Sequence, residues 1–369
     1  MKNKPRIIIS GGGTGGHIFP ALSIAASIRE LCPDAEILFV GAEGKMEMER
    51  VPAAGYRIIG LPVAGLQRSL SLRNLALPFK VIGSVRKAGQ ILAEFKPDVA
   101  VGVGGYASAP LLWSAQRKGI PCLIQEQNSY AGLTNKILSK RAQCICTAYE
   151  GMERFFPADR ILLTGNPIRK EIAVAPAAQR AEGLQFYGLD PDRKTLFVVG
   201  GSLGCGTLNR VMRDWVEHRA AAADYQVIWQ CGKYYKEGID SFMTGRRVPN
   251  LFYTDFIKRM DLAYAAADLL VSRAGAGTIS ELCVAGKATV FVPSPNVAED
   301  HQTHNAMALV EKNAAMMVRD ADADAKLLDT AEGLLADPAR IADLETNIRK
   351  LGRKDASETI AREVLKLIP

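Results

Sequence analysis

The chain has 369 residues, of which 48% are hydrophobic and 23% charged, and its 46 basic and 39 acidic residues give a formal net charge of +7. This composition excludes a disordered chain, and at roughly 150 residues per domain the length indicates two globular domains. The seven cysteines include no CxxC pair, which disfavours a disulfide framework or a zinc ribbon and predicts reduced thiols.

No targeting or membrane-spanning segment is expected. Residues 1–6 lead into an apolar run too short for the hydrophobic region of a signal peptide. The longest uncharged stretch, 99–116, is interrupted by glycines and a proline, so it does not predict a transmembrane helix. We therefore expect a cytosolic or peripheral protein.

Short β-branched or aromatic runs alternate with longer helical patterns along most of the chain. This alternation predicts βαβ units and parallel sheets. The expected strands are 6–10, 36–40, 56–60, 99–103, 122–125, 143–147 and 161–164 in the first half, and 195–199, 226–230, 251–253, 269–272, 289–292 and 315–318 in the second.

The two halves repeat one pattern, in which a strand leads into a glycine-rich turn and then a helix. It occurs at 7–16 and again at 196–206, about half a chain length later. We interpret this as two doubly wound domains that meet near 165–169, where Asn-Pro interrupts the pattern. Ligands bind beyond the carboxyl ends of the strands in such sheets, so two facing domains would hold a substrate between their glycine loops.

The first glycine turn fits the dinucleotide fingerprint at Gly11, Gly13 and Gly16. A nicotinamide enzyme also needs an acidic residue at the end of the second strand, but the nearest candidate, Glu43, lies beyond a glycine. A dehydrogenase is therefore disfavoured. The sequence contains no GxxxxGK[ST] motif, which excludes a P-loop ATPase. His17 follows the turn at a helix start, where the helix dipole favours the neutral ring that a general base requires. The alternative is a histidine that only hydrogen-bonds the loop.

Two loops in the second half suit a phosphate. Residues 200–202 and 272–278 each follow a strand and offer backbone N–H groups, and the second opens a helix. Glu281 follows in that helix, where its carboxylate can accept hydrogen bonds from a ribose diol. Together these features favour a nucleoside diphosphate, although tight-turn glycines beside a solvated glutamate are the alternative.

Three groups resemble metal or thiol sites but have simpler explanations. Asp320, Asp322 and Asp324 have DxD spacing, yet acids capping a helix N-terminus are the preferred interpretation. His301 and His304 are spaced for one helix face without an evident third ligand. Cys144 and Cys146 share one face of a strand, which favours core packing. No bound metal or other cofactor is expected.

Positive charge is concentrated between residues 57 and 96, which contain seven basic residues and one acidic residue among many apolar ones. Such a pattern suits an anionic bilayer surface, while the scarcity of aromatic residues disfavours nucleic acid. A helix with one buried and one solvated basic face is the alternative. The expected membrane patch is Leu72, Arg73, Leu75, Phe79, Lys80, Ile82 and Arg86.

Several motifs together resemble the MurG family of glycosyltransferases, family 28. They span about residues 6–310 in the family's order, and are 11–20 (GGGTGGHIFP), 104–110 (GGYASAP), 126–128 with 131–135, 165–169 (GNPIR), 200–204 (GGSLG), 256–257, 272–281 and 300–306. The resemblance implies a GT-B fold, an α/β architecture of two Rossmann-like domains facing across a cleft. Their expected bounds are 1–166 for the acceptor and membrane domain and 167–345 for the donor domain, with a helix in 346–369 that packs back on the first.

The resemblance also implies an activity. N-acetylglucosamine would pass with inversion from UDP-N-acetylglucosamine to the C4 hydroxyl of undecaprenyl-diphosphate-linked N-acetylmuramyl-pentapeptide, converting lipid I to lipid II in peptidoglycan synthesis. The enzyme would need no metal and would lie on the cytoplasmic face of the inner membrane. Its partners would be the two substrates, anionic lipids and other cell-wall synthesis and division proteins, and not nucleic acid.

Carried over position by position, the family's motifs imply roles for individual residues. His17 and Glu126 would be catalytic, with Glu126 either orienting the base or replacing it. The acceptor side would contain Gly13, Thr14, Gly104, Gly105 and Tyr106. Donor-binding residues would be Thr14, Gly15, Gly16, Asn128, Arg169, Ser202, Ile257, Gly275, Ala276, Gly277, Thr278, Glu281, His301 and Gln302.

The sequence departs from the family pattern at Leu203, Ala109, Gln125 and His301, where the family commonly has glutamine, glycine, histidine and, in some members, glutamine. Three other functions remain open at this point. They are a transferase acting on another lipid acceptor, a hydrolysing sugar-nucleotide epimerase and a non-catalytic nucleotide-sugar-binding subunit.

Overall fold

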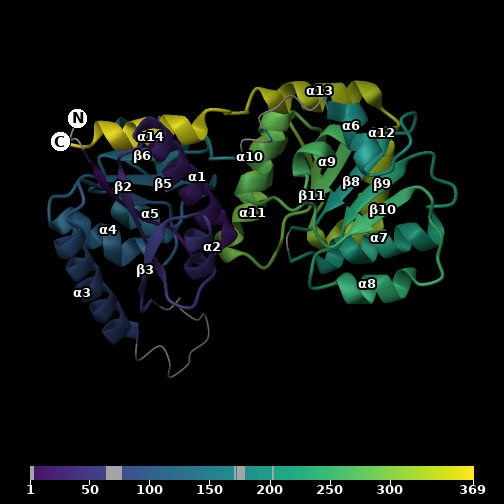
Figure 1. Cartoon of the computed structure of the whole chain (residues 1–369). Helices are drawn as coiled ribbons and strands as arrows, with labels where there is room; N and C mark the ends of the chain where they lie inside the picture. The colour runs from purple at the N-terminus through teal and green to yellow at the C-terminus, as the bar shows by residue number, and fades with distance from the viewer. Residues whose placement is uncertain (1–3, 64–76, 170–171, 173–178, 202) are drawn as a thin grey trace. The chain divides into compact units, whose positions relative to one another are not determined.

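The computed structural model describes residues 4–63, 77–169, 172, 179–201 and 203–369, with the backbone alone at 77–80 and 298. The chain forms two compact units (Figure 1). One comprises Met1–Ile168 with Asp355–Pro369, and the other comprises Arg169–Lys354. The final segment contains α14 (Ala356–Lys366), which packs against α1 (Gly15–Leu31) of the first unit.

The first unit is built on a seven-stranded parallel sheet in the order β3-β2-β1-β4-β5-β6-β7. Its strands are β1 (Arg6–Ser10), β2 (Glu36–Ala42), β3 (Arg57–Leu61), β4 (Val99–Gly102), β5 (Cys122–Glu126), β6 (Cys144–Thr147) and β7 (Ile161–Leu163). Successive residues of a strand face opposite sides, so Ile7 and Ile9 join one apolar cluster and Ile8 joins another. The sheet is therefore buried on both faces.

Helices cover both faces of this sheet. The cluster of Ile7 and Ile9 includes residues of α1 and α14, and the cluster of Ile8 includes residues of α3 (Leu77–Phe95) and α4 (Ser108–Arg117). Two shorter helices, α2 (Glu47–Ala53) and α5 (Leu133–Leu138), follow β2 and β5.

The second unit has a six-stranded parallel sheet in the order β10-β9-β8-β11-β12-β13. Its strands are β8 (Thr195–Val199), β9 (Gln226–Gln230), β10 (Leu251–Thr254), β11 (Leu269–Ser272), β12 (Thr289–Phe291) and β13 (Met316–Met317). Its helices are α6 (Arg180–Phe186), α7 (Gly206–His218), α8 (Lys236–Met243), α9 (Met260–Ala266), α10 (Ala276–Ala285), α11 (His301–Val310), α12 (Ala323–Leu335) and α13 (Pro338–Arg349). Trp215 and Trp229 lie fully buried in its core.

The strand order reverses at the first strand of each unit. The neighbours of β1 are β2 and β4, and those of β8 are β9 and β11, so a switch point lies at the carboxyl end of each strand. Both predicted glycine turns occur there, since Gly11 follows β1 and Gly200 follows β8. The predicted fold class is confirmed, and each predicted strand overlaps a strand of the structure.

No helix within the described residues is long and apolar enough to cross a membrane.

Candidate functional site

The glycine turn of the first unit is in close contact with a second glycine pair. Gly13, Gly104 and Gly105 have φ values of +87°, +94° and +87°, a region that favours glycine. A Cβ atom on Gly105 would lie 2.2 Å from the carbonyl oxygen of Gly12. The loops after β1 and β4 therefore touch through backbone atoms, which only glycine allows.

His17 lies between these loops. Its Nδ1 is 3.2 Å from the carbonyl oxygen of Gly12 and 3.2 Å from Oγ1 of Thr14. A carbonyl can only accept, so this contact assigns the ring proton to Nδ1, and in the neutral ring Nε2 is then the basic nitrogen. Nε2 faces Gly104, since a Cβ atom there would lie 2.9 Å from it.

Glu126 holds the loop that follows β5. The residue is 2% exposed, and its carboxylate accepts hydrogen bonds from the backbone N–H of Asn128 and Gly132 at 3.1 Å and from Nδ2 of Asn135 at 2.9 Å. Nδ2 of Asn128 donates to it as well, at 3.3 Å. Burial raises the pKa of Glu126, and these donors act in the opposite direction. The carboxylate therefore fixes the backbone around Asn128.

A buried amide network lies beneath the same loops and joins three of the motifs. Nε2 of Gln125 donates to Oδ1 of Asn166 at 2.8 Å, and Nδ2 of Asn166 donates to the carbonyl of Gln127 at 2.9 Å. Nε2 of Gln127 donates to the carbonyl of Val103, directly before Gly104. Gln127 is not among the site residues predicted from the sequence, although it lies between Glu126 and Asn128 in one of the family motifs.

Tyr106 and Gly13 belong to the loops after β4 and β1. Tyr106 follows the Gly104–Gly105 pair and its side chain is 56% exposed. Gly15 and Gly16 form the first turn of α1.

In the second unit, the loop after β8 packs against the loop after β9. A Cβ atom on Gly204 would lie 2.2 Å from the carbonyl oxygen of Cys231, and one on Gly232 would lie 2.1 Å from Cα of Gly204. Nε2 of Gln230 donates to the carbonyl of Gly201 at 2.9 Å. Leu203 is exposed, and Ser202 lies outside the described residues.

The start of α10 provides backbone N–H groups that the helix itself does not use. Gly275 is the N-cap residue, and no side-chain hydrogen bond caps this end in the structure. The N–H groups of Ala276, Gly277 and Thr278 in the first turn have no partner within the helix. Such a helix end, with its dipole, suits an anion, and this one lies beside the switch point between β8 and β11.

Arg169 and Glu281, 112 residues apart in sequence, form a bidentate pair. Nε and Nη2 of Arg169 lie 2.7 and 2.8 Å from the two carboxylate oxygens of Glu281. The hydroxyl of the fully buried Tyr264 also donates to Glu281, at 3.2 Å. Burial, followed by the charge of Glu281, raises the pKa of Tyr264 well above its usual range. Glu281 is thus buried and held, and is not the solvated glutamate of the alternative interpretation.

Three further predicted donor residues lie on loops or a helix start of the second unit. Ile257 follows β10 and is buried. Oε1 of Gln302 accepts from the N–H of Ser294 at 2.9 Å, which fixes the loop after β12. His301 begins α11 and is half-buried.

The three aspartates at 320–324 bind basic side chains. Asp320 pairs with Arg273 at 2.6 Å, Asp322 with Lys326 at 3.5 Å and Asp324 with Arg210 at 3.0 Å. They do lie at the start of α12, but Asp322 makes no side-chain cap hydrogen bond, so the capping interpretation was wrong in that respect. Among the described residues there is no group of three or more His, Cys, Asp or Glu side chains that could hold a metal ion.

The expected membrane patch falls partly outside the described residues. Leu72, Arg73 and Leu75 lie outside them, and Phe79 and Lys80 are described by their backbone alone. Ile82 is 65% exposed, and both its neighbour Val81 and Arg86 are also exposed on α3. Trp113 of the adjoining α4 is partly exposed beneath the guanidinium of Arg117.

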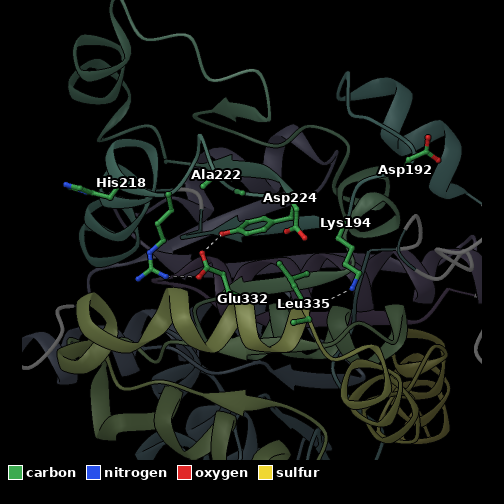
Figure 2. A pocket seen from close by; sticks show the side chains of 11 residues that line it. Asp192, Lys194, His218, Ala222, Asp224, Glu332 and Leu335 are labelled. Carbon is green, nitrogen blue, oxygen red and sulfur yellow. Dashed lines mark hydrogen bonds and ion pairs between the residues drawn. The ribbon is translucent and has the colours of Figure 1, made fainter.

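Figure 2 shows a cavity of about 560 Å³ in the second unit. It lies at the opposite ends of the strands from the glycine loops, since Lys194 and Tyr225 directly precede β8 and β9. Its polar groups bind one another: Glu332 accepts from Arg219 at 2.7 Å and from Tyr225 at 2.9 Å, and Lys194 donates to the carbonyl of Leu335. This cavity is therefore not the candidate site.

Comparison with known proteins gives two family matches. Residues 7–147 match the glycosyltransferase family 28 N-terminal domain, and residues 195–360 match the glycosyltransferase family 28 C-terminal domain.

Curated relatives match over nearly their whole length. The chain is 54% identical to a UDP-N-acetylglucosamine--N-acetylmuramyl-(pentapeptide) pyrophosphoryl-undecaprenol N-acetylglucosamine transferase of Parabacteroides distasonis, covering 99% of both chains. It is 55% identical to the protein of the same name from Phocaeicola vulgatus, covering 100% of this chain and 97% of the relative.

A solved structure agrees with these relatives. The crystal structure of Acinetobacter baumannii MurG matches with a TM-score of 0.80 and 27% identity, covering 98% of this chain and 99% of that one. The chain therefore belongs to glycosyltransferase family 28 and, within it, to the family of UDP-N-acetylglucosamine--N-acetylmuramyl-(pentapeptide) pyrophosphoryl-undecaprenol N-acetylglucosamine transferases.

Proposed function

We propose that this chain transfers N-acetylglucosamine from UDP-N-acetylglucosamine to the C4 hydroxyl of undecaprenyl-diphosphate-linked N-acetylmuramyl-pentapeptide, with inversion at the anomeric carbon. The observation that carries the proposal is the 54% identity to relatives of that name over 99% of the chain, because it includes both units. The positions of the two glycine turns support it, since both lie at switch points, where parallel sheets bind ligands.

The second unit would bind the donor. The uncapped start of α10 suits the diphosphate, with N–H groups of Ala276, Gly277 and Thr278 directed at its oxygens. The Arg169–Glu281 pair supplies a carboxylate for the ribose hydroxyls and a guanidinium for the developing phosphate charge. Ile257 would bind uracil through its backbone, and His301, Gln302 and, from the first unit, Asn128 would contact the sugar. Ser202 and Gly275 would complete the diphosphate site.

The first unit would bind the acceptor and supply the base. The acceptor C4 oxygen attacks the anomeric carbon as Nε2 of His17 takes its proton, while the bond to the diphosphate oxygen breaks and UDP leaves with the electron pair. Preorganised N–H groups stabilise the charge that develops on the leaving group. Glu126 acts as a positioning residue because its oxygens hold the loop of Asn128. Gly13, Thr14, Gly15, Gly16, Gly104, Gly105 and Tyr106 shape the surroundings.

The exposed apolar and basic side chains of α3 and α4 would place the first unit on an anionic membrane. Ile82, Val81 and Trp113 offer apolar surface, and Arg86 and Arg117 offer positive charge. Apolar insertion and attraction to acidic lipids add to each other at an interface. The enzyme would thus be peripheral on the cytoplasmic face of the inner membrane, where lipid I is anchored and other cell-wall proteins can reach it.

The purified protein is expected to transfer labelled N-acetylglucosamine to a short-chain lipid-linked muramyl-pentapeptide, with no loss when a chelator is added. UDP-glucose as donor and diacylglycerol as acceptor serve as controls and should give no product. UDP-N-acetylglucosamine binding without transfer would contradict the proposal and favour a binding subunit.

His17→Ala should lower kcat by about 10²- to 10⁴-fold, the usual contribution of a general base, with little change in KM for UDP-N-acetylglucosamine. The pH profile of kcat should also lose its acidic limb, in which protonation of the base lowers the rate. His218→Ala is the matched control, because His218 is exposed on α7 and contacts Asp214. Full turnover by His17→Ala would remove the proposed role.

Glu281→Gln should raise KM for UDP-N-acetylglucosamine by about 10-fold or more, since hydrogen bonds to a charged acceptor contribute roughly 1.5–3 kcal/mol, and should change kcat less. Calorimetric titration with UDP should show the same loss of affinity. The control is Glu217→Gln, which removes an exposed ion pair with Arg246 in the same unit. Unchanged UDP affinity in Glu281→Gln would contradict its placement at the nucleotide.

Ile82→Glu should weaken co-sedimentation with phosphatidylglycerol vesicles several-fold, because it places a negative charge in the exposed apolar surface. Transfer to a water-soluble acceptor should be unaffected. Phe186→Glu is the control, since Phe186 is similarly exposed, at 55%, on α6. Equal binding by both variants would contradict the proposed membrane surface.

A further inference from the structure

Glu47 is a fully buried acid that the reaction outlined above does not use. It begins α2, and its carboxylate has no exposed surface. Both of its oxygens accept from the N–H of Gly13 at 3.1 Å, and Oε1 also accepts from the N–H of Ala42 at 3.0 Å. A carboxylate from the second βα unit thus lies against the glycine turn of the first.

Glycines on both sides make room for this carboxylate. A Cβ atom on Gly12 would lie 2.1 Å from Oε1 of Glu47, and one on Gly41 would lie 2.6 Å from its Cγ. Neither position accepts a side chain while Glu47 is in place. Gly12 and Gly41 therefore leave space for a carboxylate of the protein itself. The glycine pattern of this turn is otherwise typical of loops that bind a phosphate.

One peptide group connects Glu47 to His17. The N–H of Gly13 and the C=O of Gly12 belong to the same peptide, which is trans, so the two groups point in opposite directions. The N–H donates to Glu47, and the C=O contacts Nδ1 of His17 at 3.2 Å. By holding the N–H, Glu47 determines where the carbonyl points.

The direction of that carbonyl decides which nitrogen of His17 is basic. If the Gly12–Gly13 peptide turned over, its N–H would face Nδ1 and favour the tautomer protonated at Nε2. Such a ring could not accept a proton through Nε2. Gly13 lies at a positive φ beside another glycine, so its own sequence does little to prevent this rotation.

We propose that Glu47 is a positioning residue that sets the His17 tautomer through the Gly12–Gly13 peptide. The catalytic consequence rests on the proposed function, whereas the effect on the tautomer does not. Glu47→Gln is the informative substitution, because it keeps the size of the side chain but removes its charge and replaces one of the two oxygens that accept from the Gly13 N–H with an NH₂ donor.

The tautomer is measured directly by ¹⁵N–¹H correlation spectra of histidine-labelled protein at a pH of about 8, above the ordinary pKa of a histidine side chain. The chain has four histidines, and His17→Ala identifies the signals of His17. The wild type is expected to show the proton on Nδ1. Glu47→Gln is expected to show a mixture or the Nε2–H form, with kcat lowered about 10-fold or more and KM for UDP-N-acetylglucosamine within about twofold.

Two control variants distinguish a positioning role of Glu47 from a general effect on the stability of the first unit. Glu43→Gln removes an exposed acid of the same β2–α2 connection that pairs with Lys87, and should change neither the tautomer nor kcat. Ile360→Ala removes buried apolar volume on α14 and lowers the stability of the same unit without touching the turn. It should leave the His17 tautomer as in the wild type.

A wild-type ring protonated at Nε2 would overturn the proposal, even if Glu47→Gln fails to fold. So would a folded Glu47→Gln protein with the wild-type tautomer and kcat, or a loss of kcat no larger than that of Ile360→Ala. If the wild type transfers no sugar, the proposed function fails, and the tautomer spectra of the substrate-free protein still decide the role of Glu47.

Discussion

Backbone amides beyond the carboxyl ends of β1, β8 and β11, where the chain turns into a helix, are the constraint on which the site depends. A parallel sheet brings the carboxyl ends of its strands to one edge. Where the strand order reverses, the connections that leave neighbouring strands run to opposite sides of the sheet, which leaves space between them. The chain must turn sharply there into a helix, which leaves N–H groups without partners in either element. The glycines at these turns allow other atoms to approach those groups closely.

The two units satisfy the same constraint in different ways. In the first, the buried carboxylate of Glu47 accepts from Gly13 and Ala42, so part of the turn is closed by the protein itself. The turn can then present a histidine in a defined orientation. In the second, the start of α10, which follows β11, has no side-chain cap among the described residues and suits the external anion of our proposal. A strand that leads through glycines into a helix thus supports a proton acceptor after β1 in one unit and, in our proposal, a phosphate site after β11 in the other.

Buried polar groups around both turns are paired almost throughout. Glu126 accepts from four donors, Gln125 and Gln127 bind to each other and to Asn166, and Glu281 is held by Arg169 and Tyr264. A buried polar group without a partner costs free energy, and a satisfied network becomes rigid. This rigidity is what preorganised donors need in order to stabilise developing charge without rearrangement.

The sequence by itself determined the strands, the two doubly wound sheets and the positions of both glycine turns, because hydrophobic periodicity and turn chemistry are local properties. It also drew attention to His17, Glu126, Arg169 and Glu281. It did not reveal that Arg169 and Glu281 pair with each other, that Asp320 binds Arg273, or that Glu47 supports the first turn. Each of these contacts joins residues between 34 and 112 positions apart. Such partners are chosen by the packing of strands and helices, which brings distant segments together, and only the tertiary structure could decide them.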